Sequence, residues 1–400
     1  MGGCMIRTDR SRCEEYERCP RARYLHYEKD GGVERVSQSV PLILGSLIHE
    51  PLSRILEPGR VDPIEAIIEE AKQKYLATVG ERGLFLDYFD GSDAMAGKVV
   101  DPTAWQVEEQ LSLLEGIVLA WVKVRLPKIL DEYDVLMVEK ECPFQLSPDI
   151  LFMTRADAVL RRKATHELFV LNFKSTSDAN STWREQWRLD QQTLSEVLGV
   201  EAVMGERVAG VLIEGLVKGR RNVQWPRESG NWYHNSPLIW CWKNAGAAPF
   251  PSSYATSYEY EDAATGKTHR LGKGWERALV VREMGIKAWL EQLEAQSPEL
   301  LAQQFISLPP ILRSDYEIEC WKKATIAQEG QIAGNSLMVM GETNLDSLFP
   351  MHTSHGNCLR PGKCQFFDLC HGVGDMEDPL QFRKRKPNHP QESGIIQGGV

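Results

Sequence analysis

The chain has 400 residues, of which 42% are hydrophobic and 26% charged, and this length allows two or three domains around a large buried core. No apolar run approaches the ~18 residues of a membrane span, and the first residues lack the apolar segment of a secretory signal, so we expect no membrane association. The formal net charge of -10 excludes a protein that coats nucleic acid over its whole surface, although it permits one basic cleft.

The first third of the chain is predicted to be helical. Residues 12–30 form a short helix with Cys19 near its middle, and a second helix carries His49. Apolar residues recur at helical spacing over 61–76 and 105–126. This spacing indicates a helical insert that precedes the sheet.

β-Strands are predicted in the middle of the chain. The segment 135–144 alternates and is rich in β formers, and 154–160 with 168–174 form a hairpin. A helix over 183–204 and a buried strand over 208–217 follow. This order of strand, hairpin, helix and strand suits a mixed α/β sheet with a crossover helix.

The last part of the chain gives weaker signals. Residues 222–275 show no sustained period and are read as long loops with at most a small β-ribbon. Two helices are predicted over 275–296 and 313–332. The residues from about 375 to 400 are polar and contain little that could pack, so they are predicted to be disordered.

The predicted hairpin places one acid, one amide and one lysine at a spacing used by metal-dependent nucleases. Because side chains alternate along a strand, Asn172 and Lys174 share a face of the second arm, and Asp157 on the first arm can lie beside them. Phosphodiester hydrolysis needs an activated water and neutralisation of the developing charge, which is why hard cations with oxygen ligands recur in nucleases.

This pattern resembles the PD-(D/E)XK signature, in which an acid, a second acid two residues before a lysine, and the lysine surround one or two Mg2+ or Mn2+ ions. The resemblance implies a restriction-endonuclease-like α/β core, with a mixed sheet flanked by helices, and a metal-dependent DNA nuclease. It makes Asp157 the central ligand and Lys174 the residue that orients the attacking water. Asn172 stands where the family has its second acid. Either this change inactivates the enzyme, or a divergent site still works with the backbone carbonyl of Phe173 and other ligands.

The start of the chain resembles RecB-like nucleases of the same superfamily. Cys19-Pro20-Arg21 is followed by Gly45-x-x-x-His49, which is similar to the opening of that group. By this resemblance His49 is a metal ligand.

The helix after the lysine carries a partial match to a further RecB-like motif, a glutamine followed four residues later by a tyrosine that contacts the DNA or the water. Gln191 and Gln192 are both candidates, and Gln192 is preferred, but Ser195 or Glu196 stands at the tyrosine position. Glu139, on the strand before the hairpin, is either an outer acid of the site or a solvated strand residue.

Nine cysteines in a chain without a secretion signal favour a reducing compartment, and cytoplasm is expected. Cys358, Cys364 and Cys370, taken with Cys19, resemble the iron staple of the RecB-like group that includes AddB nucleases and CRISPR-associated adaptation nucleases. There, one N-terminal and three C-terminal cysteines hold a 4Fe-4S cluster. Zinc bound by the same four thiolates is the alternative, and Cys13 could replace Cys19.

These assignments divide the chain into N-terminal helices (1–60), a helical insert (61–134), a nuclease core (135–221), a loop-rich and then helical region (222–340), an iron-sulfur segment (341–372) and a disordered tail (373–400). The favoured function is a DNA exonuclease or end-processing nuclease that acts on single strands or free ends. Any unwinding then requires a helicase or another recombination partner. The alternatives are a non-catalytic DNA-binding relative of the same fold and an interaction protein clasped by zinc.

Overall fold

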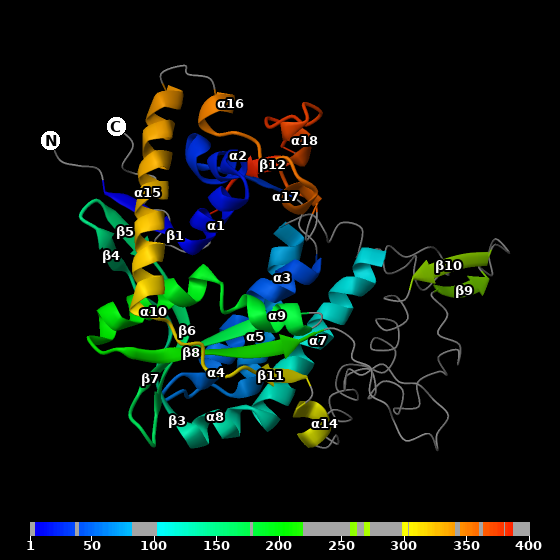
Figure 1. Ribbon diagram of the computed structural model, residues 1–400. Coiled ribbons are helices and arrows are strands. Elements are labelled where there is room, and N and C mark those ends of the chain that lie inside the picture. The colour runs from blue at the N-terminus through cyan, green and yellow to red at the C-terminus, as the bar shows by residue number, and fades with distance from the viewer. Residues whose placement is uncertain are drawn as a thin grey trace.

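A five-stranded mixed sheet lies at the centre of the computed structural model, in the order β11-β8-β7-β6-β3 (Figure 1). The structure describes residues 5–36, 40–81, 102–176, 179–218, 257–261, 268–272, 298–302, 304–340, 345–359, 363–379 and 381–386. The strands of the sheet are β3 Tyr133–Glu141, β6 Arg155–Arg162, β7 Leu168–Thr176, β8 Val208–Val217 and β11 Phe305–Ser307. β7 and β8 are parallel, and the other neighbouring pairs are antiparallel. The predicted mixed sheet is confirmed.

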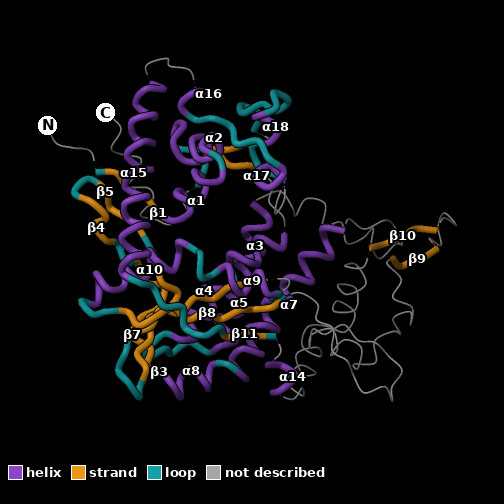
Figure 2. The backbone as a smooth tube through the Cα atoms, in the orientation of Figure 1, coloured by secondary structure: helices purple, strands orange, loops and turns teal. Residues whose placement is uncertain are grey.

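Helices cover both faces of this sheet (Figure 2). One face packs on α3 Val40–Leu47, α4 His49–Leu56, α5 Ile64–Glu81, α7 Pro102–Val124 and α8 Leu126–Glu132. The other face packs on α9 Ser181–Gln186, α10 Gln191–Met204 and α15 Asp315–Met340. A small sheet of β1 Ile6–Asp9, β5 Ile150–Met153 and β4 Phe144–Ser147 extends this second core. Within the described residues, no helix is both long and apolar enough to cross a bilayer.

The N-terminal helices and the C-terminal segment form a third packed region, above the sheet in Figure 1. It contains α1 Arg10–Arg18, α2 Pro20–Arg23, a π-helical turn Tyr24–Glu28, a 3-10 turn Lys29–Gly31, β2 Val33–Arg35, α16 Leu345–Leu348, α17 His355–Leu359, α18 Phe367–Cys370 and β12 Phe382–Lys384. A separate antiparallel ribbon pairs β9 Ser257–Glu261 with β10 Thr268–Gly272, and α14 spans Pro298–Ala302.

The prediction of disorder after residue 373 is wrong for the strand β12, which pairs with β2 in antiparallel register. Phe382 is buried, and its ring lies 6.3 Å from that of Phe366, while the guanidinium of Arg385 lies 4.4 Å above the ring of Tyr27. These contacts and the pairing of β12 with β2 order residues 381–386, although their polar composition predicts disorder. Residues 387–400 lie outside the described residues.

Two predicted helices are each interrupted in the structure. The helix over 12–30 breaks at Cys19, because Pro20 lacks a backbone donor and starts a new helix. The helix over 183–204 divides into α9 and α10, since the side chain of Asp190 caps the backbone N–H of Gln192 at 2.7 Å. The predicted helix over 275–296 lies outside the described residues.

Close packing of α10 on the connections between the central sheet and the small sheet depends on Gly199. A Cβ atom at this position would lie 2.3 Å from Cγ2 of Thr154 and 2.4 Å from the backbone oxygen of Cys142. We expect Gly199→Ala to lower the free energy of unfolding by about 1–3 kcal/mol through overpacking, measured by chemical denaturation. Gly330→Ala in α15 is the matched control, because open space surrounds that position and alanine should stabilise the helix by roughly 0.5–1 kcal/mol. Equal effects of the two changes would contradict this reading.

Candidate active site

Asp157 and His49 meet where the β6–β7 ladder ends. Oδ2 of Asp157 accepts a hydrogen bond from the backbone N–H of Phe173 at 2.7 Å and lies 3.4 Å from Nδ1 of His49, the first residue of α4. Burial acts to raise the pKa of Asp157, but the pKa is lowered overall because His49, Lys174 and the backbone N–H favour the ionised carboxylate. The site therefore holds one carboxylate that stays charged although it is buried.

Asn172 and Lys174 both contact residues of α10, as expected for two positions on one face of β7. Nδ2 of Asn172 donates to Oε2 of Glu196 at 2.5 Å, and Oδ1 of Asn172 accepts from Nε2 of Gln192 at 3.3 Å. Nζ of Lys174 donates to Oε1 of Gln192 at 2.5 Å and lies 5.3 Å from the centre of the Trp187 ring. Loss of hydration lowers the pKa of Lys174, although the charges of Asp157 and Glu196 oppose this shift.

Glu196 belongs to the same cluster, although in the sequence it stands out only as a departure from the glutamine-tyrosine motif. It is fully buried, and its Oε1 accepts from Nε2 of Gln192 at 2.5 Å. Burial raises the pKa of Glu196 to about 7. A sequence signal existed, since residues four apart on a helix lie on one face and Gln192 was already a candidate.

The start of α10 is fixed by a second set of polar contacts. Arg313 donates to Oγ1 of Thr193 and to the backbone carbonyls of Trp187, Arg188 and Asp190. These bonds satisfy carbonyl groups in the turn before the helix. The position of Gln192 and Glu196 relative to β7 is thereby held by a fixed turn.

Of the two candidate glutamines, Gln192 lies in the site and Gln191 does not. Oε1 of Gln192 also accepts from Arg10 at 2.7 Å, so α1 reaches the same cluster. The amide of Gln191 instead donates to Glu17 at 2.6 Å and accepts from the indole of Trp321 at 3.1 Å. Gln191 joins α10 to two helices that flank it.

Glu139 lies beside the site. The register of β3 against β6 places it opposite Asp157, and its backbone has a φ of 46°, which is uncommon for a residue other than glycine. The carboxylate pairs with Arg155 at 3.0 Å, and burial raises its pKa. It is partly buried, and the charges of Asp157 and His49 both act on it, so it lies at the border of the site.

Gly45 allows the side chains of Lys218 and Ser175 to approach the backbone of α3 closely. A Cβ atom at Gly45 would lie 3.2 Å from Nζ of Lys218 and 3.2 Å from Oγ of Ser175. Ser175 follows Lys174 on β7, and Lys218 follows the end of β8. The glycine that precedes His49 by one helical turn therefore leaves room for a lysine.

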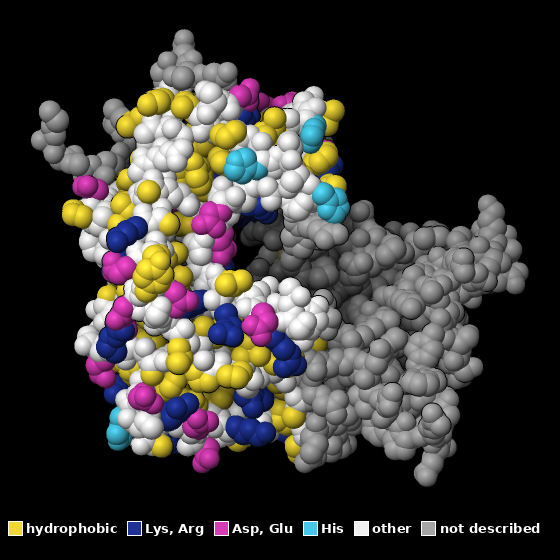
Figure 3. Space-filling model, in the orientation of Figure 1, with side chains coloured by type: hydrophobic (Ala, Val, Ile, Leu, Met, Phe, Trp, Pro, Cys, Tyr) yellow, Lys and Arg dark blue, Asp and Glu magenta, His cyan; other side chains and the backbone are white. Residues whose placement is uncertain are grey.

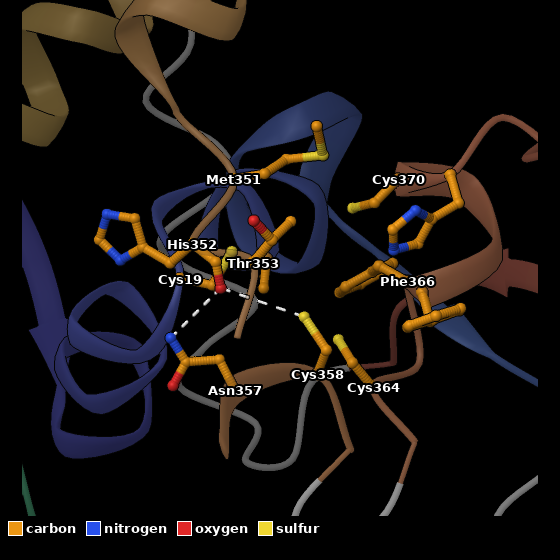
Figure 4. A pocket seen from close by; sticks show the side chains of 12 residues that line it. Cys19, Met351, His352, Thr353, Asn357, Cys358, Cys364, Phe366 and Cys370 are labelled. Atoms are coloured by element: carbon orange, nitrogen blue, oxygen red, sulfur yellow. Dashed lines mark hydrogen bonds between the residues drawn. The ribbon is translucent and has the colours of Figure 1, made fainter. Parts of the chain in front are cut away.

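The four predicted cluster cysteines line one pocket. Cys19, at the break between α1 and α2, faces the same space as Cys358, Cys364 and Cys370 of the C-terminal segment (Figure 4). Burial, together with the three neighbouring thiols, raises the pKa of Cys370 to about 11. Cys13 does not line this pocket, because its buried thiol lies 3.5 Å from Glu329. The structure thus brings Cys19, rather than Cys13, to the C-terminal cysteines.

No group of three or more His, Cys, Asp or Glu side chains in the described ranges is close enough to surround a single metal ion. The residue types nevertheless fit the expected groups. Around Asp157 they offer a carboxylate, an amide oxygen and an imidazole, which suit Mg2+ or Mn2+. Around Cys370 they offer four thiols, the natural set for an iron-sulfur cluster.

A sequence model of the PD-(D/E)XK nuclease superfamily matches residues 10–220, just over half of the 400 residues. The match includes the strands and helices that carry His49, Asp157, Lys174 and Gln192, and it ends before the C-terminal cysteines. No curated protein sequence matches the chain significantly. Members of this superfamily are in general metal-dependent nucleases, and the mixed sheet flanked by helices is consistent with their fold. The chain belongs to the PD-(D/E)XK nuclease superfamily.

Proposed function

We propose that this protein hydrolyses phosphodiester bonds of DNA with Mg2+ or Mn2+ at the cluster around Asp157. The observation that carries the proposal is the approach of His49 and Asp157 to 3.4 Å beside Lys174, on three different elements of a nuclease-superfamily fold. If Lys174 were a surface lysine and Asp157 a solvated acid of the hairpin, we would not expect them to lie together beside the buried amide of Asn172.

The chain's own residues have distinct roles in this proposal. Asp157, His49, the amide oxygen of Asn172 and the backbone carbonyl of Phe173 would hold the cation. A bound cation supplies charge neutralisation and a more acidic water. Lys174 orients the attacking water and stabilises negative charge on the phosphate oxygens. Gln192 positions Lys174, because its amide oxygen accepts the lysine's hydrogen bond.

We further propose that the substrate is single-stranded DNA or a frayed DNA end. Asp157 and Asn172 are buried, so a scissile phosphate has to enter a recess to reach them. Figure 3 shows a hollow on this face of the molecule, between the packed region of the two chain ends above and the central sheet with its helices below. One strand enters a recess more easily than a duplex does, and a helicase or recombination partner would supply unwound ends.

We also propose that Cys19, Cys358, Cys364 and Cys370 hold a 4Fe-4S cluster. They line one pocket, where the N-terminal thiol of Cys19 meets the three C-terminal thiols. Zinc binds four thiolates at about 2.3 Å from one centre, whereas a cluster distributes its thiolates over several iron atoms. Zinc on the same four thiolates is the alternative, and the metal content of the purified protein distinguishes the two.

The nuclease proposal is tested with end-labelled linear and closed circular single-stranded DNA, incubated with Mg2+ or Mn2+. We expect shortening of the linear strand only, and no cleavage by the Asp157→Asn variant. Cleavage of the circle would show an endonuclease. Absence of cleavage by the wild type and by Asn172→Asp, with salt-sensitive DNA binding retained, would favour the non-catalytic relative that Asn172 suggests.

A further inference from the structure

Glu196 is a buried carboxylate that contacts the position where the acid is missing. Both of its oxygens accept hydrogen bonds from neutral amides, Oε2 from Asn172 and Oε1 from Gln192, each at 2.5 Å. A carboxylate in the protein interior is costly unless a positive charge compensates it. Two amide donors satisfy its hydrogen bonds but supply no net charge, whereas Lys174 offsets part of the cost of burial.

We propose that Glu196 replaces the missing second acid and, with Asp157, provides the two carboxylates that bind the divalent cation. The inference rests on the proposed nuclease function and concerns the same site. It places the second acid on α10 instead of on β7, 24 residues after Asn172 in the chain. The site then has two acids and one lysine, although the second strand of the hairpin carries only an amide.

The identity of residue 172 follows from this arrangement. An aspartate there would place a second carboxylate at the present contact with Oε2 of Glu196, and two like charges at that distance repel. Asparagine instead donates a hydrogen bond to Glu196 and retains an oxygen that can ligate the ion. Asn172 and Glu196 are therefore complementary, because the amide donates a hydrogen bond to the carboxylate and the pair carries only one negative charge.

The surroundings of Glu196 favour a ligand over a purely structural acceptor. Lys174 and Asp157 are close enough to influence its charge, so it shares the electrostatic field of the site. The cap by Asp190 and the bonds of Arg313 hold the turn that begins α10, and the helix presents the carboxylate of Glu196 to Asn172.

The test measures Mn2+ binding by titration calorimetry without DNA. We expect Glu196→Gln to weaken binding by about tenfold or more. The double variant Asn172→Asp with Glu196→Gln exchanges carboxylate and amide, keeps their hydrogen bond with its direction reversed, and should restore the affinity to within about threefold of the wild type. Glu206→Gln is the matched control, because this exposed carboxylate follows α10 and pairs with Arg161. It should bind Mn2+ like the wild type.

Each other result counts against the inference. Unchanged Mn2+ affinity of Glu196→Gln overturns it and leaves the nuclease proposal standing if the wild type binds Mn2+ and cleaves DNA. The inference is also overturned if Glu196→Gln folds and loses Mn2+ affinity but the double variant does not regain it. A carboxylate at this pair of positions would then not be sufficient for binding. If Glu196→Gln does not fold, as judged by thermal unfolding, the exchange variant decides. A wild type that binds no Mn2+ overturns both proposals.

Discussion

Lys174→Met should lower the rate of DNA cleavage by about a hundredfold or more, with Mn2+ affinity unchanged or slightly higher. Methionine retains an apolar chain beside Trp187 but removes the charge that would orient water and stabilise the phosphate oxygens. Removing a cation also removes its repulsion toward a bound metal ion. Single-turnover cleavage measures the first quantity, and titration calorimetry with Mn2+ measures the second.

Two further variants test whether the cleavage rate and the Mn2+ affinity depend on different residues. Asp157→Asn should lose both Mn2+ binding and cleavage, because it removes the carboxylate that contacts His49. Lys163→Met, at the exposed turn of the hairpin, should change neither. A Lys174→Met variant that cleaves DNA at the wild-type rate would show that Lys174 is only a packing residue of β7.

The local part of the site could be predicted from sequence because strands impose a period of two. Asp157 and Asn172 come together through the register of one hairpin, in which Ala158 pairs with Leu171. The amide and Lys174 share a face for the same reason. His49 lies on a distant helix, and only its similarity to a family motif indicated that it would meet the hairpin.

The contribution of α10 could not be predicted in the same way. Gln191 and Gln192 are neighbours on a helix, and their side chains point in directions about 100° apart, so docking alone decides which one enters the site. That docking depends on Arg313 and Gly199, which are far away in the sequence or carry no side-chain signal. The four-residue spacing from Gln192 places Glu196 on the same face of the helix, but only the docking shows that this face meets Asn172.

The order of the C-terminal segment also depends on long-range contacts. β12 is held by β2 and by the buried ring of Phe382, and neither effect has a local signature in a polar tail. The break at Cys19 has a local cause in Pro20, yet its consequence is distant, because it turns the thiol toward cysteines more than three hundred residues later. The pocket is therefore where the two ends of the chain meet.

If the proposed cluster is present, Cys364→Ser should abolish the brown colour that it confers and lower the iron content from about four atoms per chain to less than about one. The serine hydroxyl is a poor ligand for iron, whereas the three remaining thiols cannot complete the set. Absorbance in the visible range and elemental analysis measure the two quantities. Cys320→Ser is the control, since that cysteine is exposed on α15 and should leave both unchanged.

Loss of the proposed cluster should loosen the N-terminal helices without unfolding the central sheet. Arg21 still donates to the backbone oxygen of Phe349 at 2.8 Å, and Arg23 still pairs with Glu329 at 3.3 Å, so other contacts continue to join the two ends. We therefore expect Cys364→Ser to unfold at a lower temperature and to become more sensitive to proteolysis near Cys19, with Mn2+ affinity retained. A colourless wild type that contains zinc would contradict the iron-sulfur assignment, yet it would leave the metal site at Asp157 untouched.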